Sequence, residues 1–353
     1  MKEILQDLNY NQIETLILSL GEKKFRAKQL YEGLTQGKAI ENISSLPKAL
    51  KDKLLETYEN EPLRIKEIFY SNDGTEKYLF ELADGHLIEG VLMKYKYGYT
   101  QCISTQVGCR MGCKFCASTL NGLIRNLTAG EILSQILLIN ALHKEEFIGQ
   151  GKQARAVTNV VLMGSGEPLD NYDNVIKFLQ NVTAAEGLNI SARNVSLSTC
   201  GLVPKIYQLA TEGIPVNLTI SLHATTDEAR ARTMPVAKAY KIAEILKACE
   251  HYFHVTGRRY YFEYTLIDGE NCDEEHAKGL IELLKGKPCH VNLIRLNEVK
   301  ERDLKSISDK QAYRFLGLLE RGGLSATLRR QIGSDIGGAC GQLRAKYIDE
   351  NKE

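Results

Sequence analysis

The stretch QVGCRMGCKFCA, residues 106–117, contains three of the nine cysteines of the chain, in the spacing Cys109-x-x-x-Cys113-x-x-Cys116. Three thiolates on one tight loop can hold three irons of a four-iron cluster and leave the fourth iron open. A zinc site is the alternative interpretation. Zinc sites take four ligands and favour two close pairs, so Cys102 would have to complete the set. The spacing therefore favours a [4Fe-4S] cluster.

An open iron in such a cluster has a specific use. It can bind the amino and carboxylate groups of S-adenosylmethionine and pass an electron to the sulfonium, which releases a 5′-deoxyadenosyl radical. The motif thus predicts an enzyme whose cofactors are one [4Fe-4S] cluster and S-adenosylmethionine.

Outward from this loop, the sequence alternates between strand-like and helix-like segments, with an expected strand at 102–107 directly before the cysteines. The other expected strands are 159–163, 194–199, 217–222, 260–267, 290–296 and 324–329, and the expected helices are 129–143, 171–186, 203–212, 239–252, 273–285 and 308–321. Repeated strand-then-helix order requires a parallel sheet, and about six units predict an incomplete (β/α)6 TIM-like barrel. A doubly wound sheet is the competing topology.

The residues before position 98 follow other patterns. Apolar residues at helical spacing predict a small helical N-terminal domain, and a β-hairpin extension follows, with turns expected at Asp73-Gly74 and Asp84-Gly85. We expect four parts: a helical accessory domain at 1–62, the extension at 63–97, a core at 98–345 and a tail at 346–353.

Composition sets limits on function. With 353 residues, 43% of them apolar and 25% charged, the chain is a globular protein and neither disordered nor fibrous. Its 45 Lys and Arg against 44 Asp and Glu remove bulk positive charge as an argument for a polyanionic partner, so a nucleic acid would need a local patch. No apolar run is long enough to cross a bilayer, and the first residues do not form a signal peptide. We expect a cytoplasmic location without membrane association.

The cysteine loop, together with NLTAGE at 126–131, resembles the RlmN family of dual-specificity RNA methyltransferases, within the radical S-adenosylmethionine superfamily. The resemblance runs from about Phe25 to Lys346. It implies methylation of C2 of adenosine 2503 in 23S rRNA and of adenosine 37 in tRNA, with two molecules of S-adenosylmethionine. It also implies an electron donor such as flavodoxin or ferredoxin, and we expect a monomer. The sister group, Cfr, methylates C8 of the same ribosomal adenosine.

Polar residues recur at the ends of the expected parallel strands, the face where barrel active sites form. Taken singly, each fits a strand-end cap as well as a ligand. The resemblance implies that seven residues there contact S-adenosylmethionine: Gly166, Glu167, Ser198, Ser221, Leu222, His223 and Asn297. It likewise makes Cys109, Cys113 and Cys116 the cluster ligands.

A further cysteine, Cys340, lies among glycines in GSDIGGACGQL at 333–343. C2 of adenine is electron-poor and cannot attack a methyl group, whereas a thiolate can. The resemblance makes Cys340 the carrier of the methyl group, Cys102 its partner thiol and Glu89 the proton acceptor. On the residues alone, Glu89 is interpreted as a solvated carboxylate on a strand. The remaining cysteines are expected to be buried and inert: Cys200, Cys249, Cys272 and Cys289.

Local charge would provide the RNA contacts. The segment 23–28 holds four cations, and Arg329, Arg330, Arg344 and Lys346 flank Cys340, although solvated surface explains such residues equally well. Val107 fits the C2 group, while Arg295 fits the C8 group. Two alternatives stay open: a Cfr-like C8 methyltransferase, and a zinc-stabilised RNA-binding module without catalysis.

Overall fold

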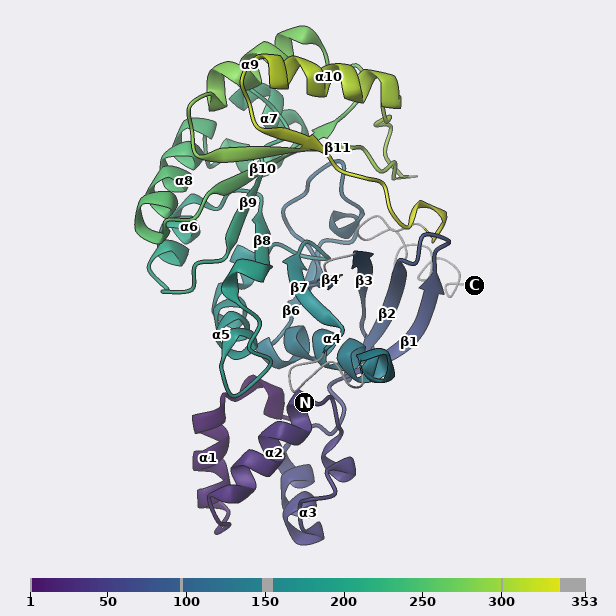
Figure 1. The fold of residues 1–353 in the computed structure, drawn as a ribbon, viewed down its shortest axis with the longest axis vertical. Coiled ribbons are helices and arrows are strands. Elements are labelled where there is room, and N and C mark those ends of the chain that lie inside the picture. The colour runs from purple at the N-terminus through teal and green to yellow at the C-terminus, as the bar shows by residue number, and fades with distance from the viewer. Residues whose placement is uncertain (1, 96–97, 148–154, 300, 337–353) are drawn as a thin grey trace.

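The computed structural model describes residues 2–95, 98–147, 155–299 and 301–336. Three N-terminal helices, α1 (Tyr10–Ser19), α2 (Phe25–Thr35) and α3 (Lys48–Thr57), form a unit at one end of the molecule (Figure 1). This unit has its own cluster of buried apolar side chains, separate from the main core. The helical prediction for this part of the chain is confirmed, while the four-part division stays a prediction.

One ten-stranded sheet organises the rest of the described chain, in the order β1-β2-β3-β4-β7-β8-β9-β10-β11-β12. Its first four strands are antiparallel: β1 (Leu63–Tyr70), β2 (Glu76–Leu82), β3 (Leu87–Tyr95) and β4 (Gly98–Cys102). The two expected turns connect β1 to β2 and β2 to β3. The extension therefore belongs to the same sheet as the core.

From β4 onward the neighbours are parallel. These strands are β7 (Val157–Leu162), β8 (Val195–Thr199), β9 (Asn217–Ser221), β10 (Tyr260–Leu266), β11 (Cys289–Arg295) and β12 (Ala326–Leu328). The crossovers carry α4 (Ala129–Leu142), α5 (Tyr172–Thr183), α6 (Val203–Ala210), α7 (Asp227–Thr233), α8 (Ile242–Thr256), α9 (Glu274–Leu284) and α10 (Asp309–Arg321). The order follows the chain without the reversal of a doubly wound sheet, which confirms the incomplete barrel.

The first parallel strand was placed too late in the sequence. The sheet strand is β4, which ends at Cys102, and residues 106–108 form β5, paired with β6 (Leu123–Asn126) in a separate small sheet. Between them the chain bends, because the main-chain N–H groups of Thr105 and Gln106 both donate to the carbonyl of Ser165. The apolar residues of the expected strand are buried as predicted. They pack against the turn after β7, however, and do not continue the pairing of β4 with β7.

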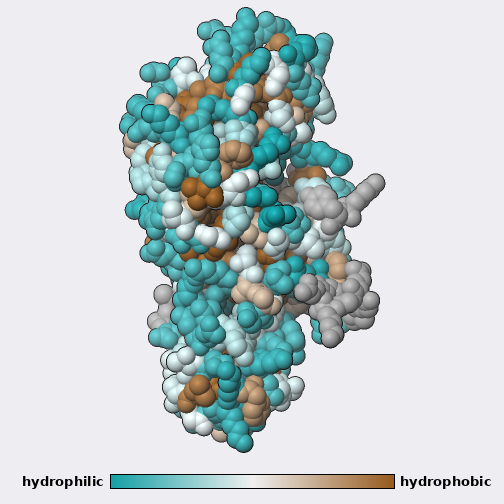
Figure 2. Space-filling model, turned by 60° about the vertical axis from the view of Figure 1, so that its left-hand side comes forward, coloured by the Kyte–Doolittle hydropathy of each residue, from teal (hydrophilic) through white to brown (hydrophobic). Residues whose placement is uncertain are grey.

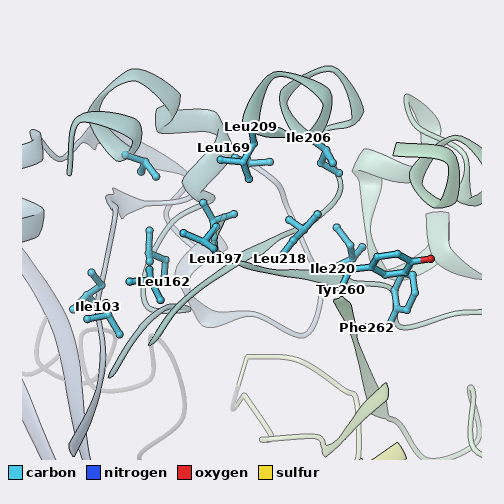
Figure 3. Packing of buried hydrophobic residues seen from close by; sticks show 14 of the residues in the cluster. Ile103, Leu162, Leu169, Leu197, Ile206, Leu209, Leu218, Ile220, Tyr260 and Phe262 are labelled. Carbon is cyan, nitrogen blue, oxygen red and sulfur yellow. The ribbon is translucent and has the colours of Figure 1, made fainter. Parts of the chain in front are cut away.

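The main core lies between the sheet and the helices that cover it. Figure 3 shows Leu162, Leu197, Leu218 and Ile220 of successive strands packed with Ile206 and Leu209 of α6. The face shown in Figure 2 is mainly hydrophilic, with hydrophobic residues visible in patches between the hydrophilic ones. None of the helices in the described ranges is long and apolar enough to span a membrane.

Two contacts connect distant parts of the chain. Asp7 accepts a hydrogen bond at 2.6 Å from the main-chain N–H of Gly130, in the first turn of α4, and so joins the helical unit to the barrel. After β12 the chain runs toward the turn between β1 and β2 (Figure 1), where Asp335 accepts from Ser71 and Asn72. The segment before Cys340 is therefore anchored on the extension.

Candidate cofactor site

A cavity of about 270 Å³ opens at the carboxyl ends of the parallel strands. Its wall combines residues of the cysteine loop with residues that end or follow the strands. The sequence-predicted residues that line it are Cys109, Cys113, Cys116, Gly166, Glu167, Ser198, Ser221, His223 and Asn297. Segments far apart in the sequence thus meet at one place.

Glycine and side-chain contacts determine the shape of the cysteine loop. Gly108 has φ +77°, and a Cβ there would lie 2.0 Å from the carbonyl oxygen of Gly122, so only glycine fits. Arg110 donates from Nε to Asp170 Oδ2 at 2.9 Å, which holds the loop against the segment after Glu167. The loop is therefore anchored to the same segment that carries the next strand-end motif.

The three thiols are chemically suited to a cluster. Cys109 and Cys113 are buried and Cys116 is half-buried, among apolar side chains that include Met234. Burial raises the pKa of Cys109 to about 12, so binding of iron has to displace a proton from this thiol. The donor set and its apolar surroundings fit a four-iron cluster.

The arrangement differs from a zinc site. Across the described ranges, no three His, Cys, Asp or Glu side chains converge closely enough to hold one metal ion. A single tetrahedral zinc needs such convergence, whereas each thiolate of a four-iron cluster binds a different iron. Three thiols on one loop match what a four-iron cluster requires, one thiolate for each of three irons.

Glu167 occupies the end of β7 as a fixed acceptor. Its carboxylate accepts from the main-chain N–H of Leu169 at 3.1 Å and of Cys200 at 2.8 Å. Burial raises its pKa, while these hydrogen bonds act in the opposite direction. The residue thereby connects the ends of β7 and β8 beside the cavity.

His223 has an unusual backbone, with φ +57° in the left-handed region. Its Nδ1 accepts from the main-chain N–H of Thr265 at 2.9 Å, so in the neutral ring the proton is on Nε2. Burial, with a smaller contribution from the Arg230 charge, lowers the pKa of His223 to about 3. The ring is therefore a neutral hydrogen-bond donor in the cavity wall.

Sequence reasoning missed an ion pair in the cavity. Glu263 of β10 accepts from Arg329 Nη1 at 2.9 Å, and both residues line the cavity. Arg329, predicted as part of a basic patch for RNA, is partly exposed and pairs with Glu263 in the cavity wall, so the RNA contact stays a prediction. No motif signals the pair, because Glu263 lies on β10 and Arg329 directly follows β12, and the two meet only when the barrel forms.

Three of the predicted site residues do not line the cavity. Leu222 is buried outside the cavity lining, and its main-chain N–H and carbonyl bind Glu263 and Arg230. Glu89 and Cys102 are buried on neighbouring strands and are also outside the lining.

Their register is informative. Val91 of β3 pairs with Cys102, and Glu89 lies two residues from Val91, so Glu89 and Cys102 face the same side of the sheet. Glu89 is only 5% exposed, so its interpretation as a solvated carboxylate was wrong. Cys340, Arg344 and Lys346 lie outside the described residues.

The other cysteines differ from one another. Cys249 and Cys289 are buried, as expected. Cys200 is buried but lines the cavity, and Cys272 is half-buried, so the common expectation of an inert core thiol was wrong in part. These cysteines differ in where they lie relative to the end of the barrel that holds the cavity. Their spacing along the chain does not reveal this difference.

Comparison with known proteins agrees with this architecture. The profile of the radical SAM superfamily matches residues 103–281, and that of the ribosomal RNA large subunit methyltransferase N-terminal domain matches residues 4–59. A protein of Alkaliphilus metalliredigens named "Probable dual-specificity RNA methyltransferase RlmN" is 51% identical over 99% of this chain and 97% of its own length. A relative from Lachnospira eligens with the same name is 49% identical over 99% and 98%.

Among solved structures, a radical SAM methyltransferase from Sphaerobacter thermophilus superposes with a TM-score of 0.91 at 39% identity, over 96% of this chain and 98% of the other. The cofactors of the superfamily are a [4Fe-4S] cluster and S-adenosylmethionine. The chain belongs to the RlmN family of radical SAM RNA methyltransferases.

Proposed function

We propose that this chain methylates C2 of an adenosine in RNA, namely adenosine 2503 of 23S rRNA and adenosine 37 of tRNAs. The observation that carries the proposal is the single cavity in which Cys109, Cys113 and Cys116 meet the polar ends of successive strands. Relatives named as dual-specificity RNA methyltransferases, alike over nearly the whole chain, support the choice of substrate.

In this proposal the methyl group travels on Cys340. The thiolate attacks the methyl carbon of one S-adenosylmethionine, so that a carbon–sulfur bond forms at Cys340 and the sulfonium bond breaks. When bound, the cluster and a second S-adenosylmethionine supply the 5′-deoxyadenosyl radical that takes a hydrogen atom from this S-methyl group. The carbon then bonds to C2, and the base is held covalently by Cys340.

Glu89 and Cys102 then release the product. Glu89 takes the proton from C2 as the adduct gives up its unpaired electron, which the oxidised cluster would accept. The sulfur of Cys102, having lost its proton, attacks the sulfur of Cys340, which forms a disulfide and breaks the carbon–sulfur bond. The released carbon takes up a proton and becomes the methyl group. Burial of both side chains on one side of the sheet supports this pairing. Anchoring of Asp335 on the turn after β1 supports it as well, because the segment before Cys340 reaches the same extension.

The helical unit supplies a candidate RNA surface. Phe25 is 51% exposed, and the guanidinium of Arg26 lies 4.7 Å from the centre of its ring. Lys23, Lys24 and Lys28 flank this pair. An exposed aromatic ring among cations suits stacking on an unpaired base and contact with phosphates. We expect RNA binding to weaken steeply with salt.

The position of Arg295 relative to the cavity bears on whether C2 or C8 is methylated. Arg295, the residue that fits the C8 group, forms an ion pair with Asp309, while its neighbours Ile294 and Leu296 line the cavity. Arg295 is thus outside the lining and gives the C8 alternative no support. Enzyme, reductant, methyl-labelled S-adenosylmethionine and RNA, followed by mass spectrometry of nucleosides, should give 2-methyladenosine. Formation of 8-methyladenosine would assign the Cfr-like activity instead.

Cys340 can be tested separately. Replacement Cys340→Ala should abolish RNA methylation and leave reductive cleavage of S-adenosylmethionine measurable as 5′-deoxyadenosine. Cys249→Ala, which removes a buried thiol outside the cavity lining, serves as the control. Full methylation by the Cys340→Ala protein would exclude the methyl-cysteine mechanism. One zinc per chain with no iron or sulfide would favour the non-catalytic alternative.

A further inference from the structure

Arg230 of α7 is the largest completely buried side chain among the described residues, with 0% exposure. Its Nη2 donates to the carbonyl of Cys200 at 2.6 Å and of Ser221 at 3.0 Å, and its Nε donates to that of Leu222 at 3.2 Å. The guanidinium therefore lies behind the ends of β8 and β9, at the wall of the cavity.

This cation has no anionic partner in the described part of the chain. No carboxylate there forms an ion pair with Arg230, and its Nη1 is buried without a hydrogen-bond acceptor. Burial of an unpaired charge is unfavourable, since carbonyl dipoles replace water only in part. A negative charge close to the guanidinium would therefore offset the cost of burying Arg230.

The cysteine loop packs beside Arg230, and two carboxylates are also near: Asp227 on the same helix, and Glu167, which accepts from the main-chain N–H of Cys200. Cys113 and Cys200 pack with Met234 in one buried cluster, and the main-chain N–H of Met234 donates to the carbonyl of Arg230 at 2.8 Å. Arg230 also donates to the carbonyl of Cys200, whose side chain packs with Cys113. The guanidinium and Cys113 therefore adjoin the same buried cluster.

We propose that Arg230 is a positioning residue that compensates the negative charge of the iron–sulfur cluster and thereby raises its midpoint potential. A four-iron cluster on three thiolates carries net negative charge, which increases when it accepts one electron from an external donor. A fixed cation in a low-dielectric wall favours the more negative, reduced form. The inference rests on the proposed assignment of the cluster to Cys109, Cys113 and Cys116.

A purely structural role makes a different prediction. If Arg230 only ties the ends of β8 and β9 together, its loss changes stability and leaves the potential of a correctly loaded cluster unchanged. Arg155 offers a matched control, because its guanidinium also donates to main-chain carbonyls, those of Leu188 and Asn189, and forms no ion pair with a described carboxylate. It lies before β7, at the opposite end of the strand from the cavity.

The test is redox titration, followed by electron paramagnetic resonance, of anaerobically reconstituted proteins without S-adenosylmethionine. Arg230→Gln and Arg230→Met should shift the midpoint potential to more negative values, while Arg230→Lys and Arg155→Met keep it near that of the unchanged protein. Equal potentials in all five proteins would overturn the proposal. So would an unchanged potential with weakened S-adenosylmethionine binding, which would assign the guanidinium to that ligand.

Folding outcomes are also informative. If only Arg230→Lys folds, the positive charge is required for folding, no shift in potential can be assigned to its loss, and the proposal fails. If none of the three variants folds, the structural role is correct and the proposal fails. Iron and sulfide content of the unchanged protein tests the cluster separately: four irons with equal potentials refute only this inference, and absence of iron refutes the proposed function.

Discussion

The Glu167 carboxylate is held by two main-chain N–H donors, and this makes it a precise part of the cavity wall. In Glu167→Gln, one oxygen becomes an amide NH2 group that cannot accept from Leu169 or Cys200. Loss of a hydrogen bond to a charged acceptor costs about 1.5–3 kcal/mol. We therefore expect the free energy of unfolding to fall by about this amount. Because the cavity wall is then less well fixed, S-adenosylmethionine should bind more weakly to the loaded protein, measured by equilibrium titration.

The matched control is Glu81→Gln. Glu81 lies on β2, where it pairs with Arg64 at 2.6 Å and does not contact the cavity. Its replacement should leave S-adenosylmethionine binding unchanged. Equal binding by the Glu167→Gln protein would show that this carboxylate does not shape the cofactor site.

Which site residues could be predicted depends on their partners. Ser198 and Ser221 follow from strand order alone, because polar residues at the carboxyl ends of parallel strands share one edge. Arg230 and Glu263 could not be predicted. Arg230 donates to main-chain carbonyls, and Glu263 pairs with Arg329, which is distant in the sequence. Neither interaction produces a recognisable pattern in the sequence.

Between β2, β3 and the end of α4, a buried network joins elements that are far apart in the sequence. Glu76 accepts from His143 Nε2 at 2.9 Å and from Lys94 at 2.6 Å, and Tyr78 also donates to it. His143 Nδ1 lies 2.5 Å from Glu146. Since both ring nitrogens face carboxylates, the protonated imidazole fits this position.

Stability should therefore depend on pH in a specific window. The hydrogen bond with Glu76 raises the pKa of His143 above its ordinary 6.5, so its contribution is complete below pH 6.5 and is lost as pH rises through the folded value. Burial opposes ionisation of Glu76, but hydrogen bonds from His143, Lys94 and Tyr78 lower its pKa to about 2. Its contribution is complete above pH 4.5 and is lost as pH falls toward 2.

Denaturant unfolding at several pH values measures how the free energy of unfolding depends on pH. His143→Gln should flatten the decline in unfolding free energy above pH 6.5, and His254→Gln, at an exposed position of α8, should not. An unaltered alkaline decline in the His143→Gln protein would show that the network does not control it.

The elements themselves were largely predictable. The capping box Thr128–Glu131 begins α4 as expected, because a threonine hydroxyl and a glutamate three residues later satisfy each other's main-chain N–H groups. The first parallel strand was misplaced, since apolar residues at 103–107 are buried in either conformation. Only hydrogen bonds to Ser165, set by tertiary structure, distinguish the two.

Attachment of the helical unit to the barrel depends on close backbone approach at one helix. A Cβ on Gly130 would lie 2.8 Å from the main-chain nitrogen of Asp7, so Gly130→Ala should force the unit away from α4 at a cost of about 1–3 kcal/mol. Faster limited proteolysis between the unit and β1 would report this.

A second helical glycine provides the comparison. Gly317 of α10 has only the end of the Arg321 side chain nearby, so Gly317→Ala should stabilise by about 0.5–1 kcal/mol through helix propensity. If both substitutions had the same effect on proteolysis, contact at Gly130 would not be what attaches the unit.

The sheet is not closed, because β1 and β12 form its two free edges in the described structure. The segment after β12 passes from one edge toward the other and contacts Asn72 and Asp73, where Asp73 accepts from the main-chain N–H of Gly333. A circular permutant opened in the turn between β1 and β2 would keep every strand pair yet lose this bridge. The length of that turn is consequently constrained by the opposite end of the polypeptide.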